Sequence, residues 1–407
     1  MYPTLYHAIY DLFGLEISAL KIVNSFGFFV AMAFVVAAAL LRREMDRKQV
    51  LGLFESTTHK VRVGDPVGWM EIAGQGVLGF LFGWKFLYLI FNAAELFNSG
   101  MPQEHLFSSE GSVFWGLFMG AGLAGLRWRQ GQKDKLDKPR IETTEIPASQ
   151  HVGGIITAAA VGGIVGAKLF HLLEYPDEFI RFFTDPSLSN FLGGLTIYGG
   201  LLMGGLAVFL YGRKHGLRFL HLADATAPGL MLGYGIGRIG CQVSGDGDWG
   251  IPNPNPQPTW LQWLPEWTWS YAYPNNVNGV YGPRSAGYTG KLIEPTDPWP
   301  IFEGYGTYLD PAVFPTAFYE TVLATMIFAL LWSLRKRIRI PGQLFALYLV
   351  FNGFERFWIE KIRVNAIMEM ANIAFTQAEL ISTLTFLSGV FLWFWFPRHN
   401  AQVIPTR

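Results

Sequence analysis

The sequence is poor in charge and in cysteine for its length. Asp, Glu, Lys and Arg make up only 15% of its 407 residues, whereas 51% are hydrophobic, and a soluble protein of this size carries about 25% charged residues. This shortage of charge, together with long apolar runs, excludes an ordinary soluble protein and indicates a membrane protein. Cys241 is the single cysteine, so an internal disulfide framework is excluded.

An excess of one sign of charge is also missing, because 31 basic residues balance 31 acidic ones. Nothing therefore indicates nucleic acid as a partner. The stretch from Met1 to Glu16 contains no Lys or Arg ahead of the first apolar segment, so no cleavable signal peptide is predicted. No metal and no organic cofactor is indicated.

Nine apolar segments favour membrane-spanning helices. They are predicted at residues 18–41, 76–97, 113–126, 153–173, 191–211, 222–240, 314–334, 344–359 and 380–396. Basic residues gather in alternate connections, which the positive-inside rule places in the cytoplasm. These basic connections are residues 42–62, 127–140, 213–218 and 335–339. The sequence thus predicts one all-α integral membrane domain over residues 1–407, with its N-terminus outside and its C-terminus in the cytoplasm.

The connection at residues 241–313 is unusually long and is predicted to lie outside by the same charge count. It is rich in Pro, Trp, Tyr, Asn and Gly, and it has four tryptophans between Trp260 and Trp269. Aromatic-rich polar sequence beside a membrane favours an interfacial cap. A solvated loop with incidental tryptophans is the alternative.

The stretch from Gly233 to Gly250 combines a glycine-rich apolar helix with a sudden change to polar sequence. Arg238 lies near the end of that helix, where a guanidinium facing lipid costs about 3 kcal/mol. Because small residues let helices approach closely, we expect Arg238 to point into a protein-lined cavity. An arginine there requires an anion, either a carboxylate or a phosphate. A snorkelling arginine at the membrane interface is the alternative.

Other ionisable residues lie near segment ends that the charge count places on the same outer side: Arg238, Tyr319, Glu320, Arg356 and Glu360. Arg356 and Glu360 are four residues apart, so they share a helix face and could pair. Two arginines with fewer buried acids than they need could together hold a phosphate. Plain pairing of Arg238 with Glu320, or of Arg356 with Glu360, would also satisfy the charges.

Five blocks carry a resemblance to a known family. They are, in chain order, Gly166-Ala-Lys-Leu-Phe170 with Glu174-Tyr175, Tyr198-Gly-Gly200, the Gly237-Arg-Ile-Gly stretch to Trp249-Gly250, Pro315-Thr-Ala-Phe-Tyr-Glu320, and Arg356-Phe-Trp-Ile-Glu360. With these blocks the chain resembles prolipoprotein diacylglyceryl transferase, and the Gly-Arg-Ile-Gly block is the most specific of them. The second and third apolar segments resemble an insertion into that family's usual seven-helix pattern.

The resemblance implies a multi-pass enzyme of the bacterial cytoplasmic membrane whose active site lies near the extracytoplasmic face. Its expected reaction transfers a diacylglyceryl group from phosphatidylglycerol to the cysteine thiol of a prolipoprotein signal peptide, which forms a thioether and releases glycerol phosphate. Arg238 and Arg356 are expected to bind the phosphate, Glu360 to orient Arg356, and Tyr198 to donate a hydrogen bond or relay a proton. The expected substrate-binding residues are Gly199, Gly200, Ser244, Asp246, Tyr319, Glu320 and Asn352.

The chain also departs from the family pattern. Tyr198 stands where the family usually has His, Cys241 where it has Asn, and Asp246 where it has Glu. Two tyrosines that the family often carries are replaced by Phe26 and Asn352. Because the family places Asn at position 241, we expect Cys241 to line the pocket, with a covalent nucleophile as the alternative.

Two other functions stay open. A catalytically inactive lipid-binding relative would fit the loss of the His. A transporter of an anionic solute would also use glycine-rich helices and intramembrane charges, but it predicts an inverted repeat and ionisable residues at several depths.

Overall fold

The computed structural model describes residues 1–96, 110–136, 140–184, 194, 196–370 and 373–399, and these are mostly helical. The chain divides into two compact units. The larger unit comprises residues 1–3, 25–56 and 147–407, and the smaller one comprises residues 4–24 and 57–146. Within the described residues, a helix coincides with each of the nine predicted segments.

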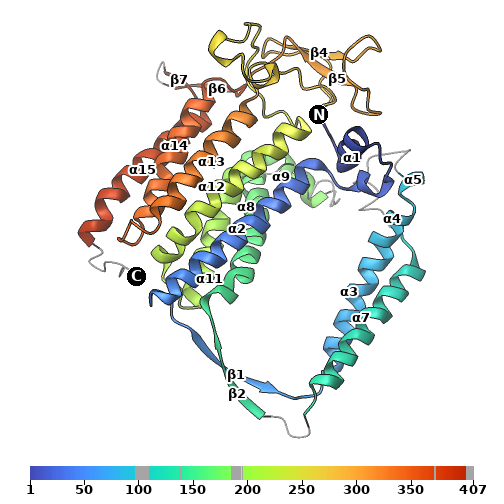
Figure 1. Ribbon diagram of the computed structural model, residues 1–407, viewed down its shortest axis with the longest axis vertical. Helices are drawn as coiled ribbons and strands as arrows, with labels where there is room; N and C mark the ends of the chain where they lie inside the picture. The colour runs from blue at the N-terminus through green and yellow to red at the C-terminus, as the bar shows by residue number, and fades with distance from the viewer. Residues whose placement is uncertain (97–109, 137–139, 185–193, 195, 371–372, 400–407) are drawn as a thin grey trace. The chain divides into compact units, whose positions relative to one another are not determined.

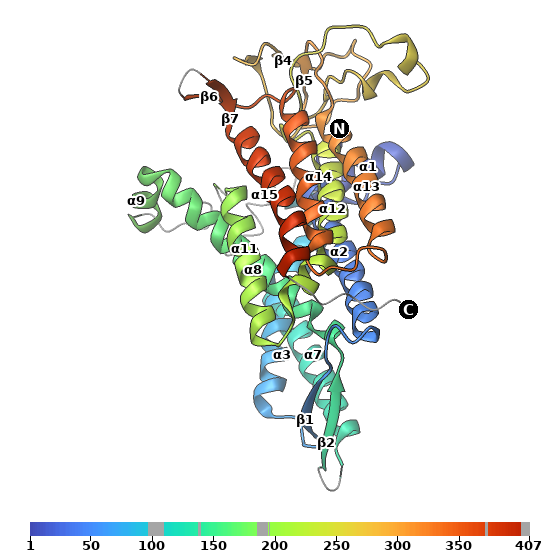
Figure 2. The ribbon, with the colours of Figure 1, turned by 90° about the vertical axis from the view of Figure 1, so that its left-hand side faces the viewer.

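The helices of the larger unit pack mostly in neighbouring pairs. Helix α12 packs between α2 and α13, helix α14 packs on α15, and α8 pairs with α11 (Figure 1). The short helix α9 leads away from the end of α8 (Figure 2). The bounds of these helices are α2 Ser25–Val50, α8 Val152–Glu174, α9 Pro176–Thr184, α11 Ile197–Lys214, α12 Phe219–Ser244, α13 Thr316–Leu334, α14 Gln343–Glu360 and α15 Gln377–His399, and the short 3-10 helix η3 spans Ala148–His151.

Glycines set the closest approaches between these helices. A Cβ atom added to Gly199 of α11 would lie 2.4 Å from the carbonyl oxygen of Gly166 in α8. A Cβ added to Gly240 of α12 would lie 3.1 Å from the Cβ of Phe29 in α2. The contact at Gly199 requires a residue without a side chain, and the contact at Gly240 leaves little room for one, as expected for small residues at helix interfaces.

Residues 241–313 fold as a small module with a core of its own. A three-stranded antiparallel sheet is formed by β3 (Gly282–Pro283), β4 (Thr289–Leu292) and β5 (Thr307–Asp310). Two short 3-10 helices, η4 (Thr259–Leu261) and η5 (Glu266–Thr268), precede it. The module lies beyond the ends of α12, α13 and α14 (Figures 1 and 2). The core consists of Trp249, Tyr273, Val280, Tyr288, Leu309 and Val313.

A second hairpin, β6 (Ile367–Met370) with β7 (Ile373–Thr376), joins α14 to α15. It leaves from the end of α14 that lies next to the module.

The smaller unit contains a helical hairpin and a two-stranded ribbon. Helix α3 (Trp69–Phe82) continues through a π-helical turn, η2 (Gly83–Leu87), into α4 (Tyr88–Phe91), and it packs on α7 (Val113–Asp134). One connection lies on each side of the helical hairpin. These two connections form the antiparallel strands β1 (Thr57–Val63) and β2 (Arg140–Ile146), which pair with each other. The remaining elements are α1 Leu5–Phe13, η1 Ser18–Ile22 and α5 Ala93–Leu96.

Several helices begin or end at residues other than the ends of the predicted segments. The first segment was predicted at 18–41, but α2 begins at Ser25 and continues to Val50. It continues past its arginines because Glu44 and Lys48 are each only 2% exposed and are ion-paired to other helices. The second segment, predicted at 76–97, is helical from Trp69. Part of the fifth, at 191–211, lies outside the described residues.

Five of the described helical stretches are long and apolar enough to cross a membrane. They are Ser25–Val50, Trp69–Phe91, Ala148–Glu174, Thr316–Leu334 and Gln377–His399. The protein is therefore a mostly helical protein with candidate membrane spans. The count of nine spans, the topology and the outer position of residues 241–313 stay predictions.

Candidate active site

Three arginines from separate parts of the chain meet at the end of the helices beside the 241–313 module. Arg238 lies in the last two turns of α12 and Arg356 in the last two turns of α14. Arg363 follows α14 in an extended segment that pairs with Gly250, where the amide of Ile251 donates to the carbonyl of Ile362 at 2.8 Å. This pairing places Arg363 beside the polar end of α12.

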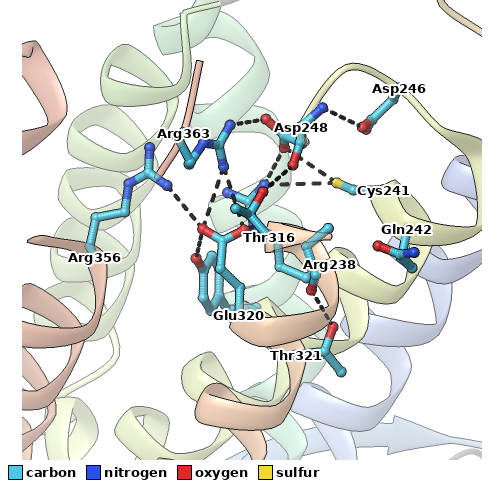
Figure 3. Close-up of polar contacts among 12 residues, drawn as sticks. Arg238, Cys241, Gln242, Asp246, Asp248, Thr316, Glu320, Thr321, Arg356 and Arg363 are labelled. Atoms are coloured by element: carbon cyan, nitrogen blue, oxygen red, sulfur yellow. Dashed lines mark hydrogen bonds and ion pairs between the residues drawn. The ribbon is translucent and has the colours of Figure 1, made fainter. Parts of the chain in front are cut away.

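The carboxylate of Glu320 lies at the centre of the three guanidinium groups (Figure 3). Its side chain, on α13, is 0% exposed. Glu320 Oε1 accepts from Arg356 Nη1 at 2.9 Å, and Glu320 Oε2 lies 3.1 Å from Arg238 Nε. Arg363 Nη1 lies 3.4 Å from both oxygens, and the hydroxyl of Tyr234 donates to Oε1 at 2.9 Å. The two predicted arginines thus converge on one anion, which in this structure is a carboxylate.

Asp248 joins two of the arginines from the other side. One carboxylate oxygen contacts Arg238 Nη1 and the other contacts Arg363 Nη2. Burial alone would raise the pKa of Asp248, but the two guanidinium groups lower it to about 2. The backbone carbonyl of Asp248 accepts a hydrogen bond from Thr316 Oγ1 at 2.8 Å, which ties the loop to the start of α13. Asp248 is therefore ionised at neutral pH and held in place.

Glu360 completes the charge network on α14. Its Oε2 lies 2.9 Å from Arg356 Nη2, and its Oε1 accepts from Asn365 Nδ2 at 2.6 Å. The two pairings considered from the sequence, Arg238 with Glu320 and Arg356 with Glu360, are both present. Among the described residues, each of the three arginines contacts two of three carboxylates, so the charges of the arginines are balanced by acids in this structure.

One strong donor of the network is left without a partner. Arg363 Nε is buried and makes no hydrogen bond within the part of the chain that is described. A buried N–H without an acceptor costs about 1–3 kcal/mol, and more when the group is charged. The site therefore has one donor that could bind a further hydrogen-bond acceptor beside the three arginines.

Cys241 lies at the edge of this network and is 6% exposed. Its Sγ is 3.5 Å from Asp248 Oδ2. Asp246 lies close by and accepts from the amide of Asp248 at 3.3 Å, and burial, then the charge of Asp248, raises the pKa of Asp246.

Cys241, Asp246 and Asp248 have side-chain ligand atoms within 4.8 Å of one another. Among the described residues, this is the group close enough to hold a metal ion. Both oxygens of Asp248 are already bound by arginines, which a cation would have to displace. The arrangement therefore favours the guanidinium groups over a metal ion.

The remaining predicted residues fall into two groups. Tyr198 lies in the first turn of α11, half-buried and within Coulombic reach of Arg356 and Glu360. Asn352 lies on α14 one turn before Arg356 and is also half-buried. These two could take part in the site.

The second group makes no hydrogen bond or ion pair with the arginines among the described residues. Gly199 and Gly200 pack against α8, so the structure gives them a role in helix packing. Tyr319 donates its hydroxyl to the carbonyl of Thr268 at 2.9 Å, away from the arginines. Ser244 is fully buried at the end of α12.

Sequence reasoning missed three residues of the site. Arg363 is seven residues after Arg356 but lies beyond the end of α14, so helical spacing alone does not indicate it. Asp248 lies within the Gly237–Gly250 block, but a substrate-binding role was predicted for Asp246, two residues before it. Glu355 is 4% exposed, and neither carboxylate oxygen has a hydrogen-bond partner in the described structure. It lies within the predicted apolar segment 344–359, so the rarity of charge in such a segment could have indicated it.

Comparisons with known proteins find relatives that share one name. A protein of Corynebacterium glutamicum named phosphatidylglycerol–prolipoprotein diacylglyceryl transferase is 28% identical over 241 residues, which cover 58% of this chain and 66% of the relative. A protein of the same name from Cutibacterium acnes is 32% identical over 213 residues, 51% of this chain and 58% of the relative. One from Chlorobaculum tepidum is 24% identical over 284 residues, 66% of this chain and 83% of the relative. The chain thus spans less than two thirds of the length of the first two relatives.

One family profile covers most of the chain. It matches residues 115–395, a range that begins in α7 and includes all three arginines of the site. The matched residues are well over half of the 407 in the chain. The chain therefore belongs to the prolipoprotein diacylglyceryl transferase family.

Proposed function

We propose that this protein transfers a diacylglyceryl group from phosphatidylglycerol to the cysteine thiol of a prolipoprotein signal peptide. The sulfur forms a bond to the glycerol carbon, the bond from that carbon to the phosphate oxygen breaks, and glycerol phosphate leaves. Negative charge grows on the phosphate as the bond breaks, so preorganised cationic donors lower the barrier. A thiol has an ordinary pKa of about 8.5 and needs only modest activation to act as the nucleophile.

The convergence of Arg238, Arg356 and Arg363 is the observation that supports this proposal most strongly. Three guanidinium groups at one point form an anion site, and the unpartnered Nε of Arg363 supplies a free donor for it. The carboxylates keep the arginines aligned and limit the charge of the empty site. A phosphate oxygen would bind the free guanidinium edges and compete with Glu320 for the rest.

We further propose that the active site faces the outer side of the bacterial cytoplasmic membrane. In the larger unit, the arginines lie at the end of α12 that leads into the 241–313 module. The basic residues of 335–339 follow the opposite end of α13, which the positive-inside rule places in the cytoplasm. Nine spans with an outer N-terminus and an inner C-terminus fit this placement.

Complementation tests the proposed function in cells. Bacteria depleted of their own prolipoprotein diacylglyceryl transferase should regain growth and lipid-modified lipoproteins when this protein is produced. Arg218→Ala is the matched control, because Arg218 is 50% exposed, precedes α12 and pairs loosely with Glu55 at 3.7 Å. The proposal predicts growth with wild type and with the control, and none with Arg238→Ala. Failure of wild type, produced and inserted normally, would support an inactive relative instead.

A further inference from the structure

Glu355 is the acidic side chain of the site that no arginine holds. It lies on α14 directly before Arg356, it is 4% exposed, and both of its oxygens lack a hydrogen-bond partner among the described residues. An ionised carboxylate in such a place is costly unless it is paired, so Glu355 gains from taking up a proton. Stability alone does not explain a glutamate at this position.

The other acidic groups of the site are poorly suited to accept a proton. Asp248, Glu320 and Glu360 each receive one or more guanidinium contacts, and these contacts favour the ionised carboxylate. A neutral phenol such as that of Tyr198, which stands where the family usually has His, has no basic nitrogen and is a weak base. The thiol proton therefore needs another acceptor.

Charged and titratable groups surround Glu355 from each helix packed against α14. The groups that interact with it electrostatically are Tyr234 and Arg238 of α12, Glu320 of α13, Tyr348 and Arg356 of α14, and Arg363 beyond α14. On α15, Glu379 lies in the first turn and is paired with Lys361 at 2.5 Å, whereas Arg398 and His399 lie in the last turn. Tyrosine and arginine side chains ordinarily keep their charge between about pH 6 and 8.5. Glu320 lies among the three guanidinium groups, so Glu355 is the acid of this site, among the described residues, whose oxygens have no hydrogen-bond partner.

We propose that Glu355 accepts the proton of the substrate thiol. This inference rests on the proposed transfer reaction. The proton moves from sulfur to the Glu355 carboxylate, the sulfur electron pair forms the bond to the glycerol carbon, and the electrons of the broken C–O bond leave with the phosphate. The proton then passes from Glu355 to the departing glycerol phosphate, which restores the carboxylate. Charge and atoms balance without any other reactant.

Turnover of Glu355→Gln measured against pH tests this role. A general base contributes about 10²–10⁴-fold, so the variant should lose at least about 100-fold at pH 6.5. Its turnover should then rise about tenfold per pH unit towards pH 8.5, because the substrate thiol ionises without help there. Wild type should also rise as the buried Glu355 carboxyl group gives up its own proton, but it should level off at a lower pH than the variant. Glu355→Asp, which keeps a carboxylate, should retain the wild-type dependence on pH at lower turnover.

Controls separate this role from a structural one and from the function itself. Glu369→Gln, at an exposed position of β6, should match wild type at every pH. A loss in Glu355→Gln that is equal at all pH values, or no loss in an active enzyme, would overturn the role of Glu355 but leave the transfer reaction standing. An inactive wild type would instead overturn the proposed function.

Discussion

Arg238 of α12 and Arg356 of α14 share one buried anion, the carboxylate of Glu320. The distances are 3.1 Å from Arg238 Nε to Oε2 and 2.9 Å from Arg356 Nη1 to Oε1. Each arginine also uses a second edge of its guanidinium group, Arg238 on Asp248 and Arg356 on Glu360. Their positions are thus fixed by pairs of contacts that only a planar, forked cation can make.

Arg238→Lys should be nearly as damaging as Arg238→Ala, because an ammonium group cannot contact Glu320 and Asp248 while also facing a phosphate. We expect each variant to lose about 100-fold or more in turnover. The same comparison applies to Arg356. Arg218→Lys, at the exposed position that serves as a control, should remain near wild type. Near-normal turnover of either active-site lysine variant would contradict the shared clamp.

Glu320→Gln should lower both stability and activity. The carboxylate is fully buried among three guanidinium groups, and removing one partner of a buried ion pair costs about 3–5 kcal/mol. Thermal unfolding in detergent should therefore shift to lower temperature. Turnover should fall because the three arginines lose the carboxylate that holds them in position. Phosphatidylglycerol should raise the unfolding temperature of the variant more than that of wild type, since its phosphate replaces the missing anion. An unchanged unfolding temperature would be evidence against the central role of Glu320.

Asp224 should matter for stability at the other end of the larger unit. It accepts hydrogen bonds from the amides of Gly342 at 2.8 Å and Phe345 at 3.0 Å, at the start of α14, and lies 3.7 Å from the buried Lys48. Asp224→Asn keeps one acceptor oxygen, enough for one of the two amides, and leaves the charge of Lys48 unpaired, whereas Asp224→Ala loses every one of these contacts. We expect Ala to be more destabilising than Asn, by about 1 kcal/mol for the lost cap. Equal unfolding temperatures for the two variants would show that the cap contributes nothing.

Cys241 should be replaceable. It is buried at the edge of the arginine network, and the family pattern has Asn at its position. Cys241→Ser and Cys241→Asn should keep at least about a tenth of wild-type turnover, the range expected when a side chain only lines a pocket. Mass spectrometry of the intact protein after incubation with phosphatidylglycerol should find no adduct. A lipid adduct on Cys241 together with loss of turnover in both variants would make it a covalent nucleophile.

Trp260 and Trp263 should touch the bilayer. They are 71% and 77% exposed, Trp260 in η4 and Trp263 in the turn that follows it. The neighbouring Trp267 packs against Phe318 at the start of α13, a candidate membrane span. A spin label on Trp263→Cys in a Cys241→Ser background should be relaxed more by oxygen than by a water-soluble nickel chelate. The reverse ratio would place the segment in water and contradict an interfacial cap.

The sequence predicted the helices better than the contacts between them. Apolar length located each helix because a bilayer-spanning segment needs about 20 apolar residues. The end of α2 was misplaced because the burial of Glu44 and Lys48 depends on partners far along the chain, Arg335 and Asp224. The periodicity of apolar residues and the hydropathy of a segment contain no information about such partners. The pairing of β1 with β2 was missed for the same reason, since the two strands are separated by a whole helical hairpin.

The site could be predicted in part. Arg238, Glu320, Arg356 and Glu360 were identified because intramembrane charges are rare and therefore conspicuous. Arg363 and Asp248 lie in connecting segments, where charge is ordinary, and only the pairing of Gly250 with Arg363 brings them together. The substrate role expected for Gly199 stays a prediction, and the structure adds a role in packing against α8.

The reaction of the purified protein tests the central claim most directly. The protein in phosphatidylglycerol vesicles would be incubated with a synthetic prolipoprotein signal peptide that contains one cysteine, and the peptide mass would be measured. The account predicts a mass increase equal to one diacylglyceryl group, held by a thioether that resists alkaline hydroxylamine, with equimolar release of glycerol phosphate. It also predicts no product with a peptide whose cysteine is replaced by serine, or with Arg238→Ala. An unmodified peptide with well-folded wild-type protein would contradict it.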